Sequence, residues 1–101
     1  MEKHVITGAT TAQAQRLAKN LEGQEVYLTD YNPIPQVLLK SGRFLQLSLN
    51  ENNTYVHELL KVCLDVQASY LHIIRPQERD LIQGQEVLFE EYGIQVLIEV
   101  Q

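Results

Sequence analysis

Short apolar runs alternate with segments of helical periodicity along the whole sequence, and this alternation limits the chain to few folds. The apolar runs predict five strands, at residues 4–7, 25–29, 44–49, 70–74 and 95–100. Strands that alternate with helices are typical of a parallel sheet built from right-handed βαβ units. We therefore expect one α/β domain over residues 1–101.

Four helical segments are expected between these strands. The first follows Gly8 and ends at Gly23, and the second spans 36–40. The third carries an apolar stripe over 56–64, with Asn53 or Thr54 as its N-cap. The fourth spans 77–92. Gly84 lies inside the last segment and weakens that helix by about 1 kcal/mol relative to alanine.

The third strand has the alternating pattern of a sheet edge, whereas the first, second and fourth strands are more uniformly apolar. Strands buried on both faces of a parallel sheet have such apolar runs. This difference favours the order 3-2-1-4-5 with helices on both faces, which is a three-layer Rossmann-like domain.

Charge and cysteine content exclude several classes of function. The net charge is −5 and the eight basic residues are scattered, which is not expected of a protein that binds nucleic acid or anionic membranes. The single cysteine leaves no intramolecular disulfide, and no Cys/His spacing predicts a metal site. Without a signal-peptide pattern or an apolar run near the ~20 residues that span a bilayer, a cytoplasmic location is expected.

In a sheet of this order the winding reverses between the first and fourth strands, and ligands bind beyond the carboxyl ends of those strands. The polar and small residues that follow the strands are therefore the candidate ligand-binding residues. They are Thr7, Gly8, Ala9, Thr10, Thr11, Asp30, Arg75 and Glu78.

The turn after the first strand carries part of a dinucleotide-binding pattern. Thr7-Gly8 matches the start of T-G-x-x-x-G-x-G, with Ala12 and Ala14 where the later glycines would be. The loop amides and the helix dipole would hold an anion, and Asp30 would accept from a ribose hydroxyl. NAD(P) or an adenine nucleotide is thus the candidate cofactor. Alternatively, the turn only needs small residues for packing, and Asp30 caps the turn at Asn32-Pro33.

The other reactive side chains have structural interpretations. Cys63 lies on the apolar face of its helix and is expected in the core. The three histidines are spread over two strands and a helix without metal spacing. Arg75 fits either a bidentate contact with a phosphate or carboxylate ligand or a surface ion pair with a neighbouring glutamate. The acidic side chain of Glu78, in the first turn of the last helix, would interact favourably with the dipole of that helix. No catalytic constellation is evident.

Several segments taken together resemble the N-terminal pre-ATP-grasp domain of carbamoyl-phosphate-synthetase-like and other ATP-grasp ligases. These segments are 6–9, 25–33 with its Asp-x-Asn-Pro, 55–64, 71–76 and 88–97. The resemblance implies a Rossmann-like domain that packs against a separate ATP-grasp domain, which holds ATP and magnesium and performs the ligation. It also implies that Glu78 corresponds to the polar or acidic residue that family members have after the fourth strand.

The Thr-Gly-Ala turn also resembles that of short-chain dehydrogenases and sugar-nucleotide epimerases. Those enzymes need a Tyr-x-x-x-Lys pair, which does not occur here. We therefore expect a non-catalytic accessory or interaction domain that binds a small ligand or a protein at the crevice between the first and fourth strands. A second copy, paired through the fifth strand, or a separate catalytic chain would be its partner. The alternative is a nucleotide-binding module of an enzyme that another chain completes.

Overall fold

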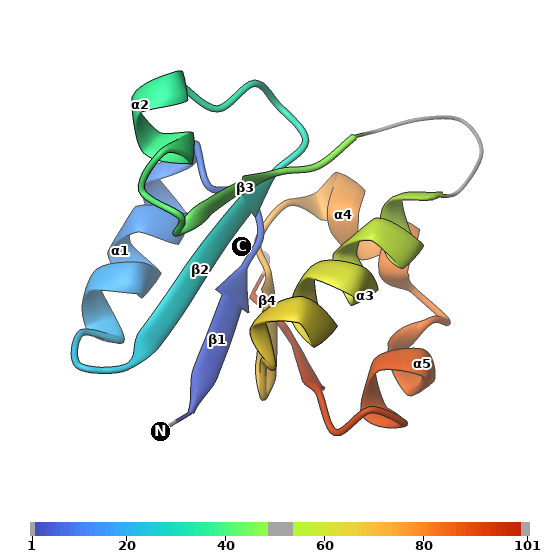
Figure 1. Cartoon of the computed structure of the whole chain (residues 1–101). Helices are drawn as coiled ribbons and strands as arrows, with labels where there is room; N and C mark the ends of the chain where they lie inside the picture. The colour runs from blue at the N-terminus through green and yellow to red at the C-terminus, as the bar shows by residue number, and fades with distance from the viewer. Residues whose placement is uncertain (1, 49–53, 100–101) are drawn as a thin grey trace.

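The computed structural model describes residues 2–48 and 54–99. It contains a five-stranded, all-parallel sheet in the order β3-β2-β1-β4-β5 (Figure 1). The strands are β1 (Lys3–Ile6), β2 (Glu25–Asp30), β3 (Phe44–Gln46), β4 (Tyr70–Ile73) and β5 (Gln95–Ile98). The predicted class and strand order are thus confirmed. The strand ends expected at Leu49 and Val100 lie outside the described residues.

Helices lie on both faces of the sheet. The bounds are α1 (Ala12–Asn20), α2 (Gln36–Leu39), α3 (Thr54–Val66), α4 (Pro76–Ile82) and α5 (Glu86–Glu90). In Figure 1, α1 and α2 lie on one side of the sheet, and α3, α4 and α5 on the other. The helix predicted after the third strand begins at Thr54, while Asn53, the other expected N-cap, is outside the described residues. Among those residues, no helix has the length and apolar character needed to cross a membrane.

The prediction of one continuous helix over 77–92 is wrong. The backbone leaves the helix at Gln83 (ψ 128°) and passes through Gly84 with φ +83°, so α4 and α5 are separate. Each of the two helices buries one apolar side chain completely, Ile82 from α4 and Phe89 from α5. The break therefore gives the segment two contacts with the core, and Gly84 supplies the backbone conformation that it needs.

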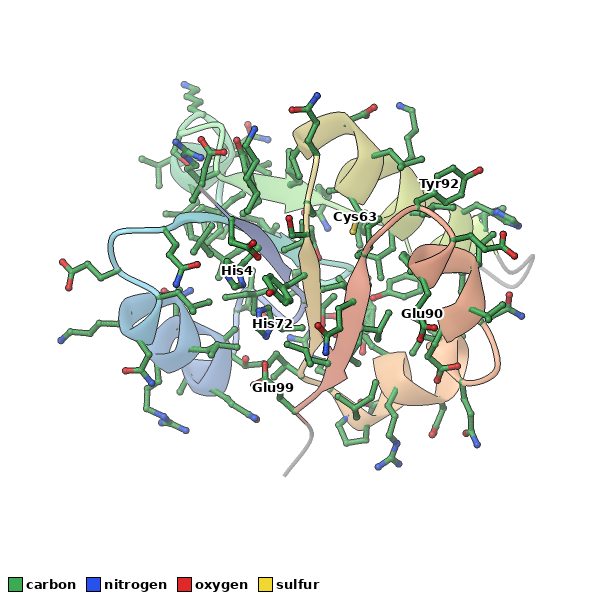
Figure 2. The ribbon with its side chains drawn as sticks, turned by 90° about the horizontal axis from the view of Figure 1, so that it is seen from below. His4, Cys63, His72, Glu90, Tyr92 and Glu99 are labelled. Atoms are coloured by element: carbon green, nitrogen blue, oxygen red, sulfur yellow. The ribbon has the colours of Figure 1, made fainter. Side chains whose placement is uncertain are left out.

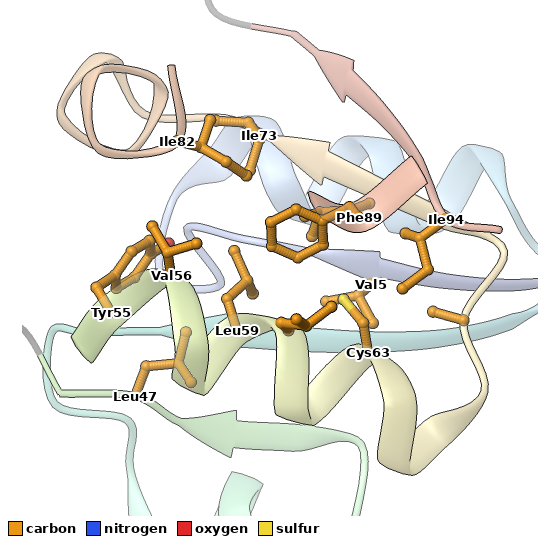
Figure 3. Close-up of a cluster of buried hydrophobic side chains, with 13 residues drawn as sticks. Val5, Leu47, Tyr55, Val56, Leu59, Cys63, Ile73, Ile82, Phe89 and Ile94 are labelled. Atoms are coloured by element: carbon orange, nitrogen blue, oxygen red, sulfur yellow. The ribbon is translucent and has the colours of Figure 1, made fainter. Parts of the chain in front are cut away.

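The larger hydrophobic core lies between the sheet and α3, α4 and α5 (Figure 3). Its fully buried side chains include Val5 and Leu71 from the central strands and Leu59 and Cys63 from α3. Cys63 is a core residue, as predicted, and burial raises the pKa of its thiol to about 12. A smaller core on the other face packs α1 against β1 and β2. The two cores hold the carboxyl ends of the strands in place, where the candidate site lies.

Candidate functional site

The loop from β1 to α1 turns at Gly8, as predicted. Gly8 has φ +69°, a conformation that residues with a Cβ rarely adopt, and a Cβ there would lie 3.3 Å from the Cβ of Ile74. Thr11 then caps α1, because its Oγ1 accepts a hydrogen bond from the Ala14 amide at 3.1 Å. The loop is therefore held close to the end of β4.

The loop amides already have partners within the protein. The Ala9 amide donates to the Thr29 carbonyl at 2.9 Å, and the Thr11 amide donates to the Gly8 carbonyl at 2.9 Å. The Thr10 amide donates to Asp30 Oδ2 at 2.8 Å. An anion bound at this loop would have to replace these acceptors.

Asp30 is the centre of the polar cluster. Its side chain is fully buried, and Arg75 binds both carboxylate oxygens, with Nη2 3.1 Å from Oδ2. Thr10 donates to Oδ2 through its hydroxyl as well as its amide. The Asn32 amide donates to Oδ1 at 2.9 Å, so the predicted cap of the Asn32-Pro33 turn is confirmed. Asp30 thus has no free oxygen to offer a ribose hydroxyl in this conformation.

These donors determine the charge of Asp30. Burial alone would raise the pKa of its carboxyl, but the hydrogen bonds from Arg75, Thr10 and Asn32 outweigh burial and hold that pKa below its usual value. Arg75 in turn lies over the ring of Tyr31, with 5.0 Å from its Cζ to the ring centroid. Of the two roles expected of Arg75, the structure shows an ion pair, but this pair is largely buried and its partner is Asp30, whereas a surface pair with a glutamate was expected.

A second buried pair lies beside this cluster. The Tyr55 hydroxyl, from the first turn of α3, donates to Glu78 Oε2, and both side chains are almost completely buried. The other oxygen of Glu78, Oε1, has no hydrogen-bond partner among the described residues. Burial raises the pKa of Glu78 despite the Tyr55 hydrogen bond and the nearby charge of Arg75. Sequence reasoning missed Tyr55 because the apolar stripe of its helix was counted from Val56.

Thr7 joins the two central strands beneath this cluster. Its Oγ1 donates to the His72 carbonyl at 3.1 Å and accepts from the Ile74 amide at 3.2 Å. Of the predicted residues, the structure thus brings Thr10, Asp30 and Arg75 into direct contact. Glu78 lies next to them, whereas the Thr7 hydroxyl binds the backbone of His72 and Ile74.

A groove of about 450 Å³ opens on the opposite side of the β1–α1 loop, between α1 and α2. Thr10, Thr11 and Gln15 contribute its polar groups. Its walls are otherwise apolar and come from Ala9, Ala12, Ile34, Pro35, Leu38 and Phe44. Small-molecule sites in proteins typically measure about 300–1,000 Å³ and have mostly apolar linings.

The side chain of Gln46 fixes the β2–α2 loop that forms one wall of this groove. Its Oε1 accepts from the Ile34 amide at 2.9 Å. Its Nε2 lies 2.9 to 3.1 Å from the carbonyls of Asp30, Asn32 and Leu47, which share its two N–H groups. In the sequence Gln46 is only a polar residue of an alternating strand, so no signal there predicts this role.

Comparison of the sequence with models of protein families gives no match, and a search of curated proteins finds no significant relative. No family or relative therefore assigns a role to these residues. Within the described parts of the chain, no group of three or more His, Cys, Asp or Glu side chains is placed to hold a metal ion.

Proposed function

We propose that this chain is a non-catalytic, Rossmann-like accessory domain of the kind that the resemblance to pre-ATP-grasp domains implies. In this proposal it binds a small aromatic or heteroaromatic ligand in the groove between α1 and α2. The observation that carries the proposal is the contrast between the two sides of the β1–α1 loop. On the β4 side the polar groups are bound to one another, whereas on the α2 side there is open, mostly apolar space.

The chemistry of the polar cluster supports a non-catalytic role. A general acid or base must come within hydrogen-bond reach of its substrate. Glu78 and Asp30 are both fully buried, and Asp30 is saturated by donors from the protein. The Arg75 side chain reaches from the end of β4 past β1 to Asp30 at the end of β2, so its guanidinium is already bound at the point where the winding reverses.

The lining of the groove supports the class of ligand. Pro35, Leu38 and Phe44 give the groove apolar walls, against which an aromatic ring would gain about 25 cal/mol for each Å² of apolar surface removed from water. The side-chain amide of Gln15 would bind a ring nitrogen or carbonyl through the N–H that its hydrogen bond to the Ala9 carbonyl does not use.

Amide NMR spectra recorded with millimolar adenine or indole would test this proposal. We expect shifts at Ala9, Ala12 and Phe44, and we expect Leu38→Glu to abolish them by placing a charge in the groove. Val37→Glu is the matched control, because Val37 is 75% exposed on the same helix and does not line the groove. Absent shifts in the wild type, or equal binding by the two variants, would contradict the proposal.

A nucleotide-binding module of an enzyme completed by another chain is the second candidate. It is favoured by one observation: the groove reaches Thr11 and Ala12, where α1 begins and its dipole attracts an anion. Calorimetry with ATP, AMP and NAD⁺ separates the two candidates. Micromolar binding of a nucleotide that adenine does not match would favour the module. No heat at millimolar nucleotide would count against it.

A further inference from the structure

Four side chains form a continuous hydrogen-bonded chain on the α1 face of the sheet. His4 Nδ1 lies 2.9 Å from His72 Nε2, and His72 Nδ1 lies 2.5 Å from Glu99 Oε2. At the other end, His4 Nε2 lies 2.7 Å from Gln24 Oε1. Figure 2 shows His4, His72 and Glu99 in succession beneath the sheet. We call these four residues the histidine relay.

The relay follows from the strand register. His4 pairs with Tyr70, and Ile6 pairs with His72, on the adjacent parallel strands β1 and β4. Both imidazoles therefore point to the same face, and both are at least 94% buried. The Tyr70 ring stacks on His4, with 4.9 Å between ring centroids and 17° between ring planes, and so limits rotation of that imidazole.

Glu99, at one end of the relay, is the residue at which the chain leaves β5. Its amide donates to the Ile73 carbonyl at 2.8 Å, and its carbonyl accepts a hydrogen bond from the Gln13 side chain of α1. Its carboxylate binds His72. The relay therefore connects the end of β5 to β4, β1 and the α1–β2 loop.

The hydrogen bonds of the relay require a definite number of protons. The Gln24 carbonyl oxygen and the Glu99 carboxylate are acceptors, so His4 Nε2 and His72 Nδ1 must each carry a proton. The two inner nitrogens are 2.9 Å apart, and one proton must lie between them. Three protons on four ring nitrogens are one more than two neutral imidazoles hold.

We propose that His4 and His72 act together as a one-proton switch that closes the histidine relay and holds the end of β5 in place. With the shared proton, all three hydrogen bonds form. Without it, two lone pairs face each other at the inner contact, or Gln24 must turn its amide group toward His4 and reverse the direction of the relay. Loss of the proton also removes the positive charge that Glu99 balances, and so weakens the contact between His72 and Glu99.

Charged and titratable groups from several elements surround the two imidazoles. Burial lowers the pKa of His72 and the charge of His4 lowers it further, whereas the Glu99 carboxylate raises it. Glu99 balances the one positive charge of the relay. Tyr70, from β4, has its pKa raised by the nearby Glu2, which precedes β1. The α1 helix contributes the neutral amide of Gln13, and its Arg16 and Lys19 are exposed.

Imidazole nitrogen NMR of the intact chain as a function of pH tests the switch. We expect His72 to keep a proton on Nδ1 and the pair to lose its shared proton in a step that the Gln24 and Glu99 backbone amides follow with the same midpoint. The exposed His57 is the internal reference. The proposal is overturned if His4 and His72 titrate independently of each other, or if those amides do not follow the step.

Glu99→Gln tests the same switch without removing either imidazole. Loss of the balancing carboxylate should lower the midpoint of the shared proton by at least about half a pH unit, a threefold loss of proton affinity. Glu90→Gln, the same change at an exposed position of α5, should leave that midpoint in place. Equal midpoints in the two variants would overturn the proposal.

Discussion

Arg75 crosses the end of β1 to bind Asp30, and so its guanidinium joins two strands, β4 and β2, that do not touch in the sheet. The contact lies at the point where the winding of the sheet reverses, which is where ligands bind in open α/β sheets. The two charged side chains best placed to bind a ligand, Arg75 and Asp30, thus bind each other.

Arg75→Ala should destabilise the fold by about 3 kcal/mol, because it leaves the fully buried Asp30 without its cation. Urea unfolding at pH 7 measures this free energy. Arg79→Ala is the control, since Arg79 is 47% exposed and makes only a long contact with Asp80. That change should cost less than about 0.5 kcal/mol. Similar losses in the two variants would mean that the Asp30 pair contributes little.

Glu78→Gln should remove a pH dependence of stability. The pKa of Glu78 is raised above its ordinary value of 4.5, so the folded state holds this proton more tightly than the unfolded chain. The resulting stabilisation is present below about pH 4.5 and is lost as the pH rises through the folded pKa. Urea unfolding at several pH values from 4 to 8 should therefore show a smaller fall for Glu78→Gln than for the wild type. Parallel curves would contradict the shifted pKa.

Gly8→Ala should cost more than Gly42→Ala. Both glycines have positive φ, +69° and +79°, so both variants carry the strain of a left-handed backbone. Only at Gly8 does the new methyl group meet a neighbour, the Cβ of Ile74 at 3.3 Å, whereas nothing lies within 4 Å at Gly42. Thermal unfolding should show an extra loss of about 1 kcal/mol for Gly8→Ala. Equal losses would show that the contact with Ile74 relaxes freely.

Cys63 should resist alkylation in the folded protein, because its thiol is fully buried and burial raises its pKa to about 12. Iodoacetamide labelling at pH 8, followed by mass spectrometry, should modify Cys63 only under conditions that unfold the chain. Leu64→Cys provides the comparison, since Leu64 is 42% exposed on the same helix. The thiol added at position 64 should react rapidly. Rapid labelling of Cys63 in the folded protein would contradict its burial in the core.

The fold could be predicted because its signals are local. The turn at Gly8, the apolar stripe of α3 and the edge pattern of β3 each follow from residues close in sequence. The contrast between β3 and the apolar runs of β1, β2 and β4 predicted the observed strand order. The prediction of a continuous helix over 77–92 was wrong because a single glycine within an apolar stripe lowers helix stability only slightly, and so does not by itself predict a break. The need of both Ile82 and Phe89 for the core is a tertiary effect.

The sequence predicted where the candidate site lies, but not which of its side chains bind each other. Asp30 and Arg75 were both expected at the carboxyl ends of their strands, yet their binding to each other depends on how far Arg75 reaches across β1. The Tyr55–Glu78 pair and the histidine relay join residues 20 to 68 positions apart. His4 and His72 read as isolated residues until the register between β1 and β4 places them on one face.

The contacts of Gln46 separate the shape of the groove from the stability of the domain. One amide group contacts four backbone groups around the β2–α2 loop from the exposed end of an edge strand, and the Gln46 side chain itself belongs to neither hydrophobic core. A substitution there would release the Ile34 wall while leaving the rest of the sheet intact. Single substitutions at Gln46 therefore offer evolution a way to change which ligands the groove accepts without unfolding the domain.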